Sequence, residues 1–165
     1  LVGSEMCIRD RVGQTPMYEA LLQIRDLTQA WCTNPAHSES FPPIVFNITD
    51  GEASDCDQRE QLAICEKIRT IGTTDGKVLL INIHIATTSD SRSLLFPTEE
   101  EIPADNRYAR LLHDCSSPMP EELSEAIRQV RGDLAKPPFR GMSYNTSIAE
   151  LIAILNIGSI SIKIQ

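Results

Sequence analysis

The sequence predicts an α/β protein with a doubly wound, mostly parallel sheet that carries helices on both faces. Residues 44–49 are apolar on both alternating faces except for Asn47, which is typical of a strand covered by helices on each side, and residues 77–86, KVLLINIHIA, are read as a second buried strand. Residues 57–71 between them have helical periodicity. The three segments therefore form a βαβ unit, whose crossover is expected to be right-handed.

The first helix is expected to begin after residue 15. Apolar residues recur at three- and four-residue spacing from 17 to 31, which indicates an amphipathic helix. Thr15 stands at its N-cap position and Pro16 in its first turn. In the βαβ helix, Asp57 and Glu60 have the spacing of a capping box.

Helices are also expected in the second half of the chain. The segments are 104–114, a stretch that opens at SSPMPEEL and ends at Gly132, and 148–158. In the last of these, Ser147 and Glu150 form a capping box. Its apolar stripe is expected to comprise Ile148, Leu151, Ile152 and Leu155. Residues 87–103 are read as a loop, 136–146 as a linker, and 160–165 as an alternating edge strand.

Composition limits the classes of function. The formal charge of −8 argues against a nucleic-acid partner, because phosphate binding requires a basic face. Five cysteines without a CxxC pair suggest neither a disulfide framework nor a zinc ribbon. No apolar run reaches the length of about 18 residues that a membrane span needs. We expect one soluble domain in a reducing cytoplasm, with no membrane partner.

The end of the first strand carries the candidate site chemistry. Thr49-Asp50-Gly51-Glu52 follows directly on the apolar run, and ligands of open parallel sheets bind at the carboxyl ends of the strands. The Asp50 carboxylate suits a hard cation. Gly51 is expected to let the backbone turn sharply without a Cβ clash.

The segments GQTPMYEAL and PPIVFNITDGEASD resemble the von Willebrand factor type A domain. In that family a metal-ion-dependent adhesion site draws on a DxSxS loop, a Thr in G-x-T-P and an Asp in T-D-G. The resemblance implies that Thr15 and Asp50 are ligands of Mg²⁺ or Mn²⁺, and that an acidic side chain of a protein partner completes the coordination. The DxSxS element is absent, so metal binding by this chain is expected to be weak.

The resemblance also implies a domain organisation. Residues 12–158 are similar to the intracellular bacterial branch of the family, some members of which are described as stress- or tellurium-resistance-associated proteins. The first strands of the fold would lie before residue 12, and residues 159–165 would be a tail. Residues 1–11, LVGSEMCIRDR, resemble a translated sequencing adaptor and are expected to be an artefactual leader.

These observations favour a metal-dependent protein-binding module over an enzyme. A Mg²⁺-dependent phosphoryl-transfer enzyme of similar layering is one alternative, and a docking domain with a vestigial metal site is another. His84 is interpreted as a hydrogen-bonded structural residue. His113 and Cys115 have no base-orienting partner in the sequence, and Ser116 and Ser117 are interpreted as helix caps.

Overall fold

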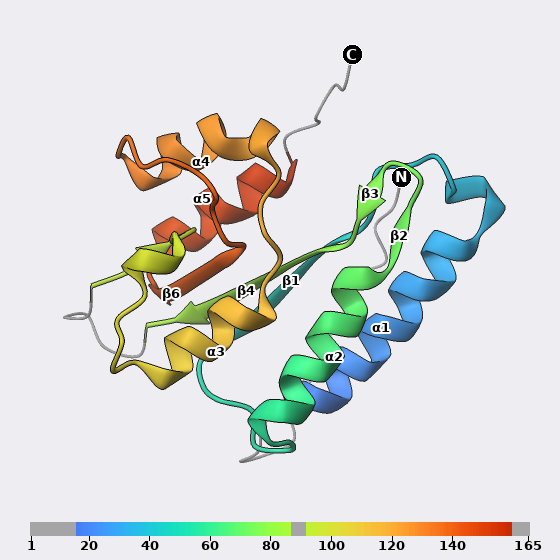
Figure 1. Cartoon of the computed structure of the whole chain (residues 1–165), viewed down its shortest axis with the longest axis horizontal. Coiled ribbons are helices and arrows are strands. Elements are labelled where there is room, and N and C mark those ends of the chain that lie inside the picture. The colour runs from blue at the N-terminus through green and yellow to red at the C-terminus, as the bar shows by residue number, and fades with distance from the viewer. Residues whose placement is uncertain (1–15, 87–91, 160–165) are drawn as a thin grey trace.

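Four strands form the central sheet in the order β1–β4–β6–β5 (Figure 1). The computed structural model describes residues 16–86 and 92–159. Three strands are parallel, and β5 runs antiparallel to β6. The bounds are β1 Ile44–Thr49, β4 Leu79–Ile85, β5 Leu94–Leu95 and β6 Met142–Thr146, and a separate hairpin pairs β2 Gly72–Thr73 with β3 Gly76–Lys77.

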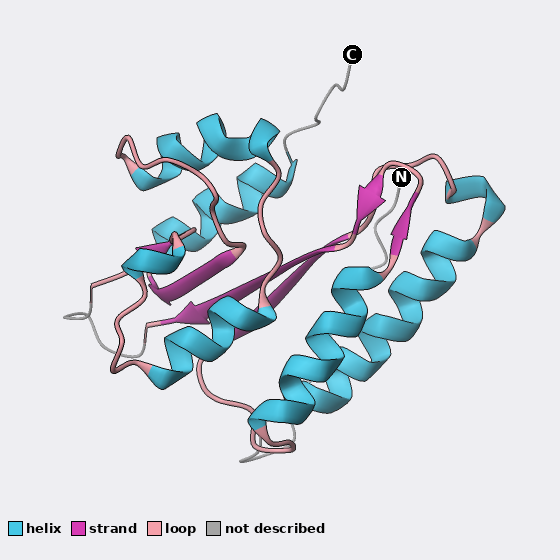
Figure 2. Cartoon of the chain, viewed as in Figure 1, coloured by secondary structure: helices cyan, strands magenta, loops and turns pink. Residues whose placement is uncertain are grey.

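Helices lie on both sides of this sheet (Figure 2). Their bounds are α1 Met17–Thr33, α2 Gln58–Thr70, α3 Arg107–Cys115, α4 Ser124–Arg131 and α5 Ile148–Ser159. Short 3-10 helices span Pro35–His37, Glu99–Glu101 and Glu121–Leu123.

The two faces of the sheet hold two separate hydrophobic cores. Val45, Leu80 and Met142 pack with buried residues of α1, α2 and α3. Ile81 and Ile83, which alternate with Leu80 along β4, pack with residues of α4 and α5. Because successive strand residues point to opposite faces, a strand buried on both sides is mostly apolar along its whole length. The predicted mostly parallel sheet with helices on both faces is confirmed.

A chain of polar side chains crosses the first core and explains the exceptional Asn47 of β1. Its Nδ2 donates to Oδ1 of Asn82 at 2.8 Å, and Asn82 Nδ2 donates to Ser116 Oγ at 2.9 Å. Ser116 Oγ in turn donates to the carbonyl of Leu112 at 2.6 Å. Buried polar groups are tolerated when they bond to one another, so these residues link β1, β4 and the end of α3. Ser116 is therefore the C-cap residue of α3 and not a cap of the following helix, contrary to the prediction.

Two predicted capping boxes are confirmed. Asp57 accepts from the Glu60 amide at 2.9 Å while the Glu60 carboxylate accepts from the Asp57 amide. Ser147 and Glu150 make the same reciprocal pair at the start of α5. For α1 the N-cap position is Pro16, without a side-chain bond. The expected cap Thr15 lies outside the described residues.

The interpretation of residues 136–146 as a linker is wrong. Met142–Thr146 is strand β6, which lies between β4 and β5. Two of its buried positions hold polar residues, Ser143 and Thr146, whose hydroxyls bond to each other at 2.6 Å. The sequence of β6 therefore lacks the apolar run that would have indicated a strand. The loop prediction for 87–103 also missed β5 and a 3-10 turn.

The expected apolar stripe of α5 is correct only in part: Leu151 packs against the second core. Ile148 and Ile152 are 64% and 57% exposed, whereas Ile154 is fully buried against the second core. The helix continues past Gly158 to Ser159. An apolar pattern that extends around much of the helix does not say which part of it faces the sheet. The predicted edge strand at 160–165 lies outside the described residues.

Candidate functional site

The turn that follows β1 carries the predicted ligand Asp50 at the carboxyl end of the parallel sheet. Asp50 is exposed and Thr49 is buried. The Thr49 hydroxyl donates to the Gly51 carbonyl at 2.7 Å and accepts from the Gly51 amide at 3.1 Å. A Cβ at residue 51 would meet nothing within 4 Å, and the backbone there is not left-handed. The predicted steric need for glycine is therefore wrong.

The ends of β4 and β6, together with α3, bring three aromatic rings beside this turn. His84 of β4 stacks on Tyr144 of β6 with ring centroids 4.7 Å apart. Tyr108 of α3 meets His84 edge-on at 5.6 Å and Tyr144 at 6.1 Å. Edge-on and offset arrangements at these distances are the favourable ones for aromatic pairs. The cluster thus packs α3 against the strand ends.

His84 is a structural residue, as the sequence suggested, and its surroundings favour the neutral form. Burial lowers the pKa of His84, while the charge of Asp50 and a hydrogen bond with the Asp50 backbone oppose that shift. Its Nδ1 lies 3.4 Å from the donating amide of Asn145. Since Nδ1 accepts, the proton resides on Nε2. The ring therefore bridges the ends of β1 and β6.

Asp55 ties the same loop to the start of α1. Its Oδ1 accepts from the Tyr18 amide and its Oδ2 from the Glu19 amide, both at 3.0 Å. A carboxylate at a helix N-terminus satisfies free amides and interacts favourably with the helix dipole. The bond to Tyr18 spans 37 positions of the sequence, so it ties together two segments that lie far apart along the chain.

The two predicted metal ligands differ in what is known of their position. Asp50 lies at the strand end as expected, and its carboxylate makes no hydrogen bond to any residue that the structure describes. Thr15 lies outside those residues. Within 16–86 and 92–159, no group of three or more His, Cys, Asp or Glu residues is arranged to hold a metal ion. Asp50 therefore needs ligands from elsewhere to hold a cation.

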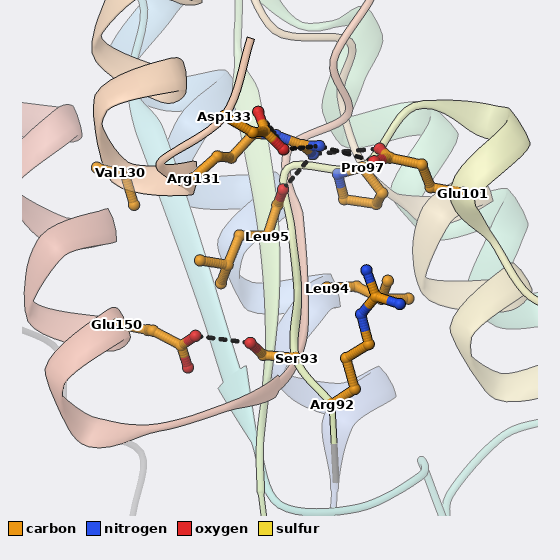
Figure 3. Close-up of a pocket in the computed structure, with 10 residues that line it drawn as sticks. All are labelled: Arg92, Ser93, Leu94, Leu95, Pro97, Glu101, Val130, Arg131, Asp133 and Glu150. Carbon is orange, nitrogen blue, oxygen red and sulfur yellow. Dashed lines mark hydrogen bonds and ion pairs between the residues drawn. The ribbon is translucent and has the colours of Figure 1, made fainter. Parts of the chain in front are cut away.

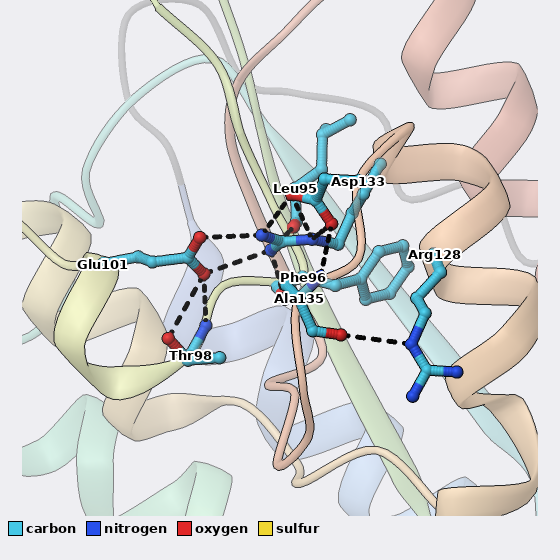
Figure 4. A network of polar contacts seen from close by, with 8 residues as sticks. Leu95, Phe96, Thr98, Glu101, Arg128, Asp133 and Ala135 are labelled. Carbon is cyan, nitrogen blue, oxygen red and sulfur yellow. Dashed lines mark hydrogen bonds and ion pairs between the residues drawn. The ribbon is translucent and has the colours of Figure 1, made fainter.

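A second polar centre surrounds Arg131 at the end of α4. The guanidinium donates to the carbonyls of Leu95 and Phe96 and pairs with Glu101 and Asp133. Figure 4 labels these four partners. The guanidinium also lies 5.4 Å from the ring centre of Phe139. These bonds join β5, a 3-10 turn and α4. Because the charged groups are bonded to one another, this centre is structural.

A cavity of about 280 Å³ adjoins this centre. Glu150 accepts a hydrogen bond from Ser93 at 2.6 Å on one wall, and Arg131 with its carboxylates forms another (Figure 3). Arg92 also lines it and makes no ion pair with a described residue. The other charged groups of the lining, Arg131, Glu101, Asp133 and Glu150, are all hydrogen-bonded or ion-paired. We therefore find no catalytic arrangement among the described residues of this cavity.

The remaining sequence candidates do not form a catalytic group. His113 Nδ1 pairs with Asp114 at 3.0 Å. Cys115 is fully buried. Its pKa is raised far above the ordinary range, mainly by a hydrogen bond with Cys65 and to a smaller extent by burial. A thiol without thiolate character is a poor nucleophile. Ser117 is no helix cap either, because its hydroxyl accepts from the Leu80 amide.

Among the described residues, none of the helices combines the length and apolar character that crossing a bilayer requires.

Comparison with known proteins does not identify a family for this chain. No family model, curated protein or solved structure matches the chain.

Proposed function

We propose that this chain is a metal-dependent protein-binding module of the von Willebrand factor type A kind, working in the cytoplasm. Thr15 and Asp50 would hold Mg²⁺ or Mn²⁺ at the top of the sheet, and an acidic side chain of a protein partner would complete the coordination. The family's bacterial branch suggests a role in stress- or tellurium-resistance-related signalling.

The hydrogen bonds from the first turn of α1 to Asp55 carry this proposal. They hold the loop that contains Asp50 against the helix whose sequence is preceded by the G-x-T-P motif. Thr15 is only two positions before Met17, the first residue of α1. The start of α1 and the loop that contains Asp50 are thus held together, which supports a site drawn from both segments.

The surroundings of Asp50 favour binding over bond-making chemistry. The nearest titratable rings belong to His84 and Tyr108, and both bond to the backbone of the turn. Burial lowers the pKa of His84 and raises that of Tyr108, so at neutral pH both are neutral. A general base must reach the proton that it removes, and neither ring is free to do so.

The proposed site should bind metal weakly on its own. Two protein ligands leave about four positions of an octahedral Mg²⁺ to water or to a partner. We therefore expect a dissociation constant of about 1 mM or weaker for Mg²⁺. A calorimetric titration that gave micromolar affinity would contradict this expectation. Weak intrinsic binding fits a module that holds its cation only when a partner carboxylate is present.

Mn²⁺ provides the test, because it is paramagnetic and broadens nearby NMR signals. In the full-length ¹⁵N-labelled chain, a millimolar Mn²⁺ titration should broaden the amides of Asp50 and Gly51 first. Asp50→Asn should abolish that broadening. Asp75→Asn is the matched control, because Asp75 is also an exposed turn aspartate but lies in the hairpin between β2 and β3. Broadening of Gly51 that persists in Asp50→Asn would overturn the proposal.

A further inference from the structure

The carbonyl of Gly51 accepts two hydrogen bonds from hydroxyl groups of different elements. Tyr108 of α3 donates to it at 2.7 Å, and Thr49 of β1 donates at 2.7 Å. The first bond joins residues 57 positions apart in the sequence. The turn that carries Asp50 is thus tied to a helix that contributes no predicted ligand.

Tyr108 is well suited to hold that carbonyl in place. Its side chain is buried, and its ring is fixed edge-on against His84 and Tyr144. Burial, assisted by the negative charge of Glu52, raises the pKa of Tyr108. The hydroxyl therefore remains protonated and acts as a donor at neutral pH. A donor on a packed ring restricts the turn more than a mobile side chain or water would.

A residue of β4 also holds the turn. The backbone of Asp50 bonds to His84, whose Nδ1 in turn faces the amide of Asn145. Asn145 is in the left-handed region with φ of 54°, which few residues other than glycine adopt. Asp50 itself is exposed, so its carboxylate projects from a backbone fixed on two sides.

We propose that Tyr108 is a positioning residue for the Asp50 site: its hydroxyl fixes the Thr49–Gly51 turn and thereby the direction of the Asp50 carboxylate. The inference rests on the proposed function where it concerns metal, and on the contacts alone where it concerns the turn. Residues that orient a ligand from behind typically contribute about 10- to 100-fold to metal affinity. Since Tyr108 acts through one backbone bond, the lower end of that range, about 10-fold, is expected.

The test compares Tyr108→Phe with Tyr144→Phe in the full-length chain. Each variant loses one hydroxyl from the same aromatic cluster, but the Tyr144 hydroxyl makes no hydrogen bond to any described residue. Tyr108→Phe should speed hydrogen exchange of the Gly51 amide. It should also raise, by about 10-fold, the Mn²⁺ concentration at which the Asp50 amide signal is half broadened. Tyr144→Phe should do neither. Unchanged exchange at the Leu80 amide, in the core, would show that both variants are folded.

The two readouts separate failure of this inference from failure of the proposed function. If wild type shows no Mn²⁺ broadening at Asp50, the metal function is wrong, and Gly51 exchange alone decides whether Tyr108 holds the turn. If wild type binds Mn²⁺ and Tyr108→Phe binds it equally well, Tyr108 is not a positioning residue. Equal Gly51 exchange in wild type and Tyr108→Phe overturns the inference in either case.

Discussion

Replacing Arg131 with methionine should destabilise the protein strongly, because it removes a nearly buried charge that joins β5 to α4. Only 6% of the Arg131 side chain is exposed. Nη1 donates to Leu95 O at 2.7 Å and to Phe96 O at 3.0 Å. A hydrogen bond to a charged group contributes about 1.5–3 kcal/mol, so the two carbonyls together account for about 3–6 kcal/mol before any rehydration.

The carboxylates bonded to Arg131 add less. The side chains of Glu101 and Asp133 remain 38% and 46% exposed, and water resolvates them when the arginine is lost. We assign each about 0–1 kcal/mol. Methionine retains part of the packing against Phe139. Partial rehydration of the carbonyls offsets some of the loss, so the net decrease in unfolding free energy should be about 3–4 kcal/mol.

Urea unfolding measures this decrease directly. With a urea dependence of about 2 kcal/mol per molar, the midpoint should fall by about 1.5–2 M. Arg128→Met is the matched control on the same helix. Arg128 bonds only the Ala135 carbonyl at 3.1 Å and Glu125 at 3.1 Å, so its loss should cost about 1 kcal/mol. Equal midpoints for the two variants would refute the assignment of Arg131 as the centre that joins β5 to α4.

Two further outcomes test the fold and the state of His84. Ile152→Ser should change the unfolding free energy by less than about 0.5 kcal/mol, whereas Ile154→Ala should lower it by about 2–5 kcal/mol, because only Ile154 is buried; similar urea midpoints would mean that α5 faces the sheet differently. Burial lowers the pKa of His84 below 6.5, so the folded state prefers the neutral ring, and the associated stability is present above pH 6.5 and lost as the pH falls below it. Wild type should therefore lose more stability than His84→Gln between pH 7.5 and 5.5 in thermal melts, and parallel pH profiles would exclude this role.

The layering of the fold could be predicted because it depends on local patterns. The strands β1 and β4 are apolar on both faces, and α2 between them begins with a capping box. These signals are contained in neighbouring residues and survive whatever the rest of the chain does. Strand β6 carried no such signal. Its buried Ser143 and Thr146 are paired with each other, and a buried pair of hydroxyls reads in sequence as an exposed polar segment.

The candidate site could be predicted only in part, for a related reason. Asp50 follows from its place at the end of an apolar strand, which is a local observation. Asp55 and Tyr108 act on that loop through bonds that span 37 and 57 positions. A single sequence contains no signal for such pairings, because any exposed Asp or any helical Tyr has the same local appearance.

These distant bonds have a mechanical reason. Within the described residues β1 is an edge strand, with β4 as its one neighbour, so a ladder of backbone bonds restrains its end from one side only. Asp55 ties the following loop to α1, while His84 and Tyr108 tie the turn itself to β4 and α3. A weak cation site loses affinity in proportion to the freedom that its ligand must give up on binding. If the metal function is right, the packing of α3 should therefore change affinity at Asp50 measurably, although by less than the loss of the Asp50 carboxylate itself.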